Sequence, residues 1–135
     1  MPAQDTAPEG APHLDVLIVE DECLTAEYLE EILAGTRFDV VGVADAVPEA
    51  LALAERTHPR LALVDLSLRD RLDGLEAARL LRERFGTTVL FVTGSPRAEA
   101  QARAAMAGPM MVLRKPFLPR QLLHMLDAAA RGLPH

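Results

Sequence analysis

The sequence is poor in the features that would place a protein outside the cytoplasm. Its 135 residues include one cysteine, Cys23, so no disulfide can form within the chain, and a reducing compartment is the simplest environment for it. No apolar run approaches the roughly 18 residues of a membrane-spanning helix. The amino-terminal segment lacks the basic and apolar regions of a secretion signal. These absences predict a soluble, cytoplasmic protein without a membrane partner.

Positive charge is also scarce. The formal net charge is -6 at pH 7, which argues against a nucleic-acid partner because such a surface needs a basic patch. There is no Walker-type phosphate loop, and Gly42 in Val41-Gly42-Val43 is no dinucleotide fingerprint. Lys115 is the only lysine, and arginine supplies the other 13 of the 14 lysine and arginine residues. Either this compact ammonium has a specific role or an arginine-rich composition left it there by chance.

Hydrophobic patterning predicts a single domain in which strands and helices alternate. Apolar runs typical of buried strands occupy residues 14–19, 38–43, 61–65, 88–93 and 110–113, and helical spacing marks residues 24–33, 48–59, 75–85, 97–107 and 118–126. This alternation favours an α/β fold, a doubly wound five-stranded parallel sheet, because parallel neighbours need right-handed crossover connections. We expect residues 1–12 to be a disordered tail, 13–131 the domain and 132–135 a short C-terminal tail.

The predicted helix at 97–107 differs from the others. It consists almost entirely of Ala, Arg, Glu and Gln, and Met106 is its only large apolar residue. Burial contributes about 0.8 kcal/mol per methylene group, so this helix gains less than its neighbours from docking on the sheet. We expect it to be the most mobile helix.

Polar side chains gather where the predicted strands end. Glu20 and Asp21 follow the first strand, Asp65 and Thr93 end the third and fourth, and Lys115 follows the fifth. The carboxyl ends of parallel strands share one edge, where open α/β sheets bind ligands. Two carboxylates about 5 Å apart repel by about 3 kcal/mol at an effective dielectric near 20, so the cluster requires a cation. Oxygen ligands favour Mg²⁺, with Mn²⁺ as an alternative.

These residues are the parts that phosphoryl transfer to a carboxylate requires. Asp65 would attack, the metal and Lys115 would neutralise the equatorial oxygens, and Thr93 would donate a hydrogen bond. The Lys115–Pro116 bond can be cis at modest cost, which would fix the ammonium over the pocket. The alternatives are that Asp65 only caps a turn and that Glu22 is a solvated first-turn residue rather than a ligand.

Four motifs in chain order resemble the receiver domains of two-component response regulators. They are Val19-Glu20-Asp21-Glu22, Leu63-Val64-Asp65-Leu66, Val92-Thr93-Gly94 and Lys115-Pro116-Phe117, within a similarity that spans residues 14–131. The resemblance implies a flavodoxin-like fold with strand order 2-1-3-4-5 and Asp65 as the phosphoacceptor. It implies that Mg²⁺ is held by Glu20, Asp21, Asp65 and the backbone carbonyl of Ser67, and that Thr93 and Lys115 contact the phosphoryl group. The implied partners are a sensor histidine kinase or histidine phosphotransfer protein as donor, and a downstream protein target.

The sequence departs from the family pattern in three places. Val112 stands three residues before the lysine, where the family usually has Tyr or Phe as a rotamer switch. The loop at 66–74 lacks the usual proline and is one residue longer than the common pattern. The segment from Phe91 to Pro96 is similar to the Phe-Ala-Thr-Gly motif of a stand-alone subgroup that also lacks the aromatic switch. We therefore expect activation to be seen mainly in residues 94–107.

Three classes of function follow. The favoured one is a phosphorylatable receiver that acts without an attached output domain, since the sequence ends at His135 directly after the last helix. It would be a monomer or weak dimer acting as a regulator, shuttle or phosphate sink, and no enzyme beyond promoting its own phosphorylation and dephosphorylation. The alternative is a receiver-like binding module that works without phosphorylation, although no acid, threonine or lysine is missing. An aspartyl phosphatase ranks last, because Ser67 stands where its second aspartate is commonly needed.

Overall fold

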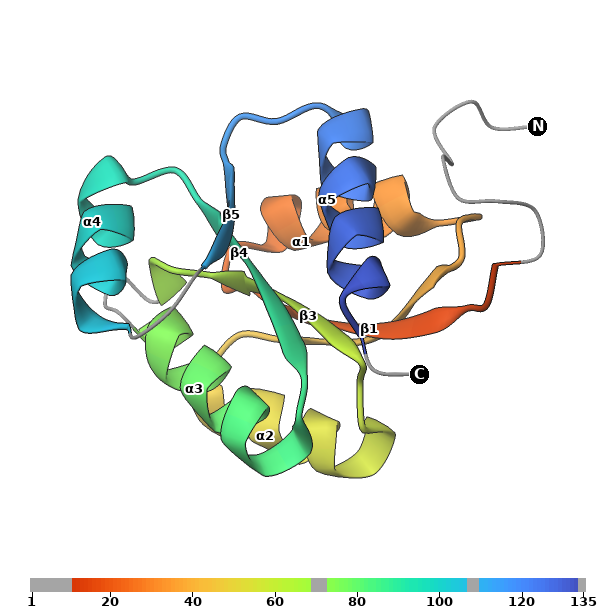
Figure 1. Cartoon of the computed structure of the whole chain (residues 1–135), viewed down its shortest axis with the longest axis horizontal. Helices are drawn as coiled ribbons and strands as arrows, with labels where there is room; N and C mark the ends of the chain where they lie inside the picture. The colour runs from red at the N-terminus through yellow and green to blue at the C-terminus, as the bar shows by residue number, and fades with distance from the viewer. Residues whose placement is uncertain (1–10, 69–72, 107–109, 134–135) are drawn as a thin grey trace.

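The computed structural model describes residues 11–68, 73–106 and 110–133, in which five strands alternate with five helices (Figure 1). The strands are β1 (Leu14–Val19), β2 (Phe38–Ala44), β3 (Leu61–Asp65), β4 (Thr88–Thr93) and β5 (Met111–Arg114). The helices are α1 (Cys23–Leu33), α2 (Val47–Thr57), α3 (Asp73–Phe85), α4 (Pro96–Ala105) and α5 (Pro119–Arg131). The predicted alternation is confirmed. Helices α2 and α4 each end two residues earlier than the pattern predicts, α5 ends five residues later, and β5 lies one residue later.

The strands form one parallel sheet in the order β2-β1-β3-β4-β5, which confirms the flavodoxin-like α/β fold. Val64 of β3 pairs with Val19 of β1 on one side and with Phe91 of β4 on the other. At the other edge of β4, Thr93 pairs with Arg114 of β5. This register aligns the carboxyl ends of β1, β3, β4 and β5, so the residues that follow these strands meet at one edge.

Helices cover both faces of the sheet. All five residues of β3 are buried, and successive side chains point to opposite faces. Ala62 and Val64 belong to a core formed with α2, α3 and α4, whereas Leu61 and Leu63 belong to a core formed with α1 and α5. Figure 1 shows α1 and α5 on one side of the sheet and α2 and α3 on the other. The helices cover the two faces of the sheet, so the edge formed by the carboxyl ends of the strands is where polar side chains can gather.

Helix α4 docks on the sheet through small side chains. Its buried residues are Ala98, Glu99 and Ala102, and Met106, directly after the helix, packs partly buried against the core. By comparison, α5 buries three leucines. Since apolar burial scales with the area removed from water, α4 gains little from its apolar contacts, as the sequence predicts. That α4 is the most mobile helix stays a prediction.

The two predicted tails are described in part. Residues 1–10 and 134–135 lie outside the described residues. The carbonyl oxygen of Pro12 accepts a hydrogen bond from Nη1 of Arg37 at 3.2 Å, and Leu133 packs in the core beside α5. Among the described residues, no helix has the length and apolar character needed to cross a membrane.

Candidate functional site

Asp65 is the last residue of β3, and its two carboxylate oxygens have different environments. The residue is 7% exposed. Oδ1 accepts a hydrogen bond from the backbone N–H of Ser67 at 2.9 Å, so Asp65 does cap the turn that follows it. Oδ2 lies 3.8 Å from Nζ of Lys115. Capping therefore occupies one oxygen, while the other faces the ammonium.

Gly74, in the first turn of α3, touches the backbone of Asp65. A Cβ at this position would lie 1.9 Å from the carbonyl oxygen of Asp65 and 2.9 Å from Cα of Leu66, so any side chain would force the end of β3 or the start of α3 to move. The sequence prediction missed this residue. The Asp73-Gly74 dipeptide is a turn signal, but it does not reveal which backbone approaches the glycine. Gly74 is a positioning residue for Asp65.

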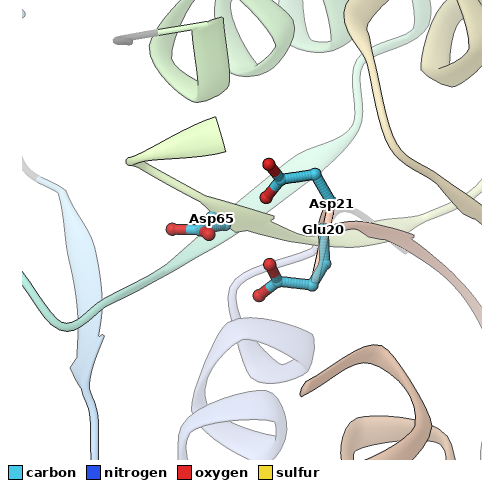
Figure 2. Close-up of side chains that lie close together, drawn as sticks. All are labelled: Glu20, Asp21 and Asp65. Carbon is cyan, nitrogen blue, oxygen red and sulfur yellow. The ribbon is translucent and has the colours of Figure 1, made fainter. Parts of the chain in front are cut away.

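Glu20, Asp21 and Asp65 form an acidic cluster. One carboxylate oxygen from each lies within 4.8 Å of the other two. Figure 2 shows the three carboxylates extending past the strand ends in the same direction, with Glu20 and Asp21 on opposite sides of the segment after β1. Glu20 is 3% exposed and Asp21 is exposed. The predicted convergence of these three acids is confirmed.

Glu20 is difficult to ionise in this environment. Burial raises its pKa from the ordinary value of 4.5 to about 7, and the neighbouring carboxylate of Asp65 adds to the effect. A hydrogen bond from the backbone N–H of Glu22 to Oε2, at 3.2 Å, acts in the opposite direction. A cation close to the cluster would therefore stabilise the ionised form of these carboxylates.

Lys115 supplies part of that charge. Its Nζ donates to Oε1 of Glu20 at 3.2 Å and lies 3.8 Å from Oδ2 of Asp65. The Lys115–Pro116 peptide bond is cis, as the sequence allows. The only lysine of the chain therefore lies against two of the three clustered acids.

The hydroxyl of Thr93 is turned toward the start of α4. Oγ1 accepts a hydrogen bond from the backbone N–H of Ser95 at 3.1 Å and donates to the carbonyl oxygen of Ser95 at 3.4 Å. The carbonyl oxygen of Thr93 accepts from the backbone N–H of Lys115 at 2.8 Å. Thr93 and Lys115 are thus adjacent at the strand edge, with the hydroxyl engaged by the β4–α4 turn.

Other predicted positions have simpler environments. Glu22 is exposed, and its carboxylate accepts a hydrogen bond from the hydroxyl of Thr25, as expected of a first-turn residue. Val112 pairs with Phe91 and is partly buried against the core. The metal role of the Ser67 carbonyl stays a prediction. The extra residue was predicted in the loop at 66–74, and residues 69–72 of that loop lie outside the described residues.

The donor set suits a hard divalent cation. Glu20, Asp21 and Asp65 offer only carboxylate oxygens, which are the ligands that Mg²⁺ prefers. The three carboxylates lie close together, and the charge of Asp65 adds to the burial that raises the pKa of Glu20, so a bound cation would relieve their mutual repulsion. The residues present therefore fit a magnesium ion.

Comparison with known proteins decides the family. The sequence profile described as the response regulator receiver domain matches residues 16–127. The chain belongs to this receiver family. The matched segment contains the acidic cluster, Thr93 and Lys115, so the site described above lies within the shared domain.

Relatives and solved structures agree with this membership. The chain is 34% identical over 116 residues to the phyllosphere-induced regulator PhyR of Methylorubrum extorquens, covering 85% of this chain and 43% of that protein. It is 32% identical over 129 residues to the transcriptional regulatory protein PdtaR of Mycobacterium tuberculosis, covering 96% and 62%. The receiver domain of Erythrobacter litoralis PhyR superposes with a TM-score of 0.79 at 26% identity, over 92% of this chain and 96% of that one. The chain thus spans about half the length of the two curated relatives, PhyR of Methylorubrum extorquens and PdtaR.

Proposed function

We propose that this receiver accepts a phosphoryl group on Asp65 from a phosphohistidine donor and thereby switches a surface that a downstream protein reads. The position of Lys115 carries the proposal: the only lysine lies 3.2 Å from Glu20 and 3.8 Å from Asp65. An ammonium in that position neutralises a phosphoryl group attached to Asp65. A sensor histidine kinase or histidine phosphotransfer protein is the donor class that membership of the family supports.

The transfer can be followed atom by atom. The Asp65 carboxylate attacks phosphorus, forming a P–O bond while the P–N bond to the donor imidazole breaks, and the electron pair of that bond stays on the nitrogen. Lys115 stabilises the charge on the equatorial oxygens, and Thr93 donates its hydroxyl hydrogen to one of them. Bound Mg²⁺, held by Glu20, Asp21, Asp65 and the Ser67 carbonyl, would supply further charge neutralisation.

The proposal is tested by intact-protein mass spectrometry after incubation with Mg²⁺ and a small phosphodonor. Acetyl phosphate and phosphoramidate are both used, because the second carries the P–N bond of the biological donor class. We expect one labile phosphoryl adduct that disappears in Asp65→Asn and without Mg²⁺. The matched control is Asp39→Asn, which removes an exposed carboxylate on β2 and should leave the adduct unchanged.

The outcomes separate the candidate functions. The same labile adduct on Asp65→Asn would show that Asp65 is not the acceptor. Absence of an adduct with both donors, in folded protein that binds Mg²⁺, would favour a receiver-like binding module that works without phosphorylation.

A further inference from the structure

An ion pair between Glu99 and Arg114 joins α4 to β5. Arg114 donates from Nε to Oε1 and from Nη2 to Oε2 of Glu99, both at 2.8 Å. Arg103 adds a third hydrogen bond to Oε2 at 3.1 Å. Glu99 is 5% exposed, and the hydrogen bond from Arg114 is the largest of the effects that lower its pKa to about 2. The carboxylate is thus buried, ionised and held by a two-pronged guanidinium.

The pair adjoins the proposed phosphorylation site on one side. Arg114 ends β5 and directly precedes Lys115, whose Nζ faces Asp65. Because the two residues are neighbours on one backbone, a displacement of the backbone at Lys115 also displaces Arg114. Glu99 lies on the other side of the contact, in the first turn of α4.

A second connection reaches the same helix through its amino end. Ser95 caps α4, since its hydroxyl accepts from the backbone N–H of Ala98 at 3.0 Å. The backbone N–H of Ser95 in turn donates to the hydroxyl of Thr93. A cavity of about 60 Å³ separates this turn from the ion pair and Lys115, which leaves room for the turn to shift.

Helix α4 has few buried apolar residues to attach it to the sheet. Apart from Glu99, the buried residues of this helix are Ala98 and Ala102, whose apolar surface is small. Val112, where the family usually has an aromatic rotamer switch, is too small to link β5 to the Thr93 turn in that way. The site is therefore connected to α4 by two polar contacts, the Glu99–Arg114 ion pair and the hydrogen bond between Thr93 and Ser95.

We propose that the Glu99–Arg114 ion pair restrains α4 in the unphosphorylated protein and couples the state of Asp65 to the position of this helix. The coupling rests on the proposed phosphorylation of Asp65. A phosphoryl group there draws Thr93 away from Ser95 and draws Lys115 toward Asp65. The movement of the chain at Lys115 displaces the neighbouring Arg114. Bidentate guanidinium geometry tolerates little displacement, so the pair weakens and α4 is released.

The restraint is tested in unphosphorylated protein with Arg114→Gln. The side chain of Arg114 is 74% exposed, so the variant should fold. We expect amide hydrogen exchange in α4 to become at least about fivefold faster, while exchange in β3 and α5 stays as in the wild type. The matched control is Glu76→Gln, which removes an exposed ion pair with Arg79 on α3 and should leave α4 unchanged. Wild-type exchange in α4 of Arg114→Gln would overturn the restraint.

The coupling is tested by equilibrium binding of beryllium trifluoride, a phosphoryl mimic, in the presence of Mg²⁺. Because coupling between two sites is reciprocal, a variant in which α4 is already released should bind the mimic at least about threefold more tightly. A merely structural contact would not raise this affinity. Equal or weaker binding by Arg114→Gln would overturn the coupling. If the wild type itself binds no mimic, the proposed function fails and the coupling with it, while the exchange experiment still decides the restraint.

Discussion

Lys115 lies closer to Glu20 than to Asp65. Its Nζ is within hydrogen-bond distance of Oε1 of Glu20, at 3.2 Å, and 3.8 Å from Oδ2 of Asp65. The lysine therefore neutralises the most buried acid of the cluster in this state of the protein. A phosphoryl group on Asp65 would compete with Glu20 for the ammonium, so Lys115 stands between two alternative partners.

The first prediction concerns the shape of this cation. Lys115→Arg keeps the charge, but a planar fork with a longer reach does not fit a point-charge position between two acids. We expect the variant to lose at least about half of the chemical-shift change that phosphorylation produces in residues 94–105, measured by heteronuclear NMR.

The control for that variant is Arg120→Lys, a charge-conserving change at an exposed position of α5. It should retain the full response to phosphorylation. Wild-type shift changes in Lys115→Arg would mean that any cation at this position suffices.

The second prediction concerns the pH dependence of the metal-free protein. The folded-state pKa of Glu20, about 7, lies above its ordinary value of 4.5, so ionisation of Glu20 opposes folding. Its contribution to stability is complete below about pH 4.5 and is lost as the pH rises through about 7. Between pH 5 and pH 8 the wild type should lose about 1–3 kcal/mol of unfolding free energy relative to Glu20→Gln. Urea unfolding of both proteins at the two pH values measures this difference.

Adding Mg²⁺ provides an internal check on this second prediction. A ligand at 100 times its Kd stabilises the folded protein by about 2.7 kcal/mol. The wild type should gain this stabilisation near pH 8, whereas Glu20→Gln, which lacks one metal carboxylate, should gain much less. Identical pH slopes in the two proteins would contradict the assignment of the raised pKa to Glu20.

The third prediction concerns Gly74. Its Cβ position lies 1.9 Å from the carbonyl oxygen of Asp65, so Gly74→Ala must displace backbone at the end of β3. We expect a loss of about 1–3 kcal/mol of unfolding free energy and slower formation of the acyl phosphate, because the Asp65 carboxylate is attached to the displaced segment. Denaturant unfolding and the rate of adduct formation measure the two effects.

Gly132→Ala is the matched control, since the nearest atom to its Cβ position is the carbonyl oxygen of Ala129 at 3.6 Å, an ordinary contact. It should change stability by less than about 0.5 kcal/mol. Normal phosphorylation by a destabilised Gly74→Ala would limit the role of this glycine to folding.

Much of the fold could be predicted from the sequence because its signals are local. Each strand is a short apolar run and each helix has apolar residues at helical spacing, so alternation and a parallel sheet follow from patterns within about ten residues. The convergence of the candidate site residues could be predicted for a related reason. Glu20, Asp21, Asp65 and Thr93 all stand at or just after strand ends, and parallel pairing brings such positions to one edge.

The remaining features depend on distances between segments that lie far apart in the sequence. Nothing local to Glu99 indicates that it meets Arg114, because the contact depends on how α4 docks against β5. Gly74 has the appearance of an ordinary loop residue until α3 packs against the end of β3.

By itself, the sequence determined the order of strands and helices, the family, and the set of acids, hydroxyl and lysine that meet at the strand edge, because periodicity and motif spacing are properties of the chain. Tertiary structure alone decided that Glu20 is buried while Asp21 is exposed, and that Lys115 lies nearer to Glu20 than to Asp65. Burial and pairing distance depend on all the segments packed around a side chain, and those segments come from across the whole chain.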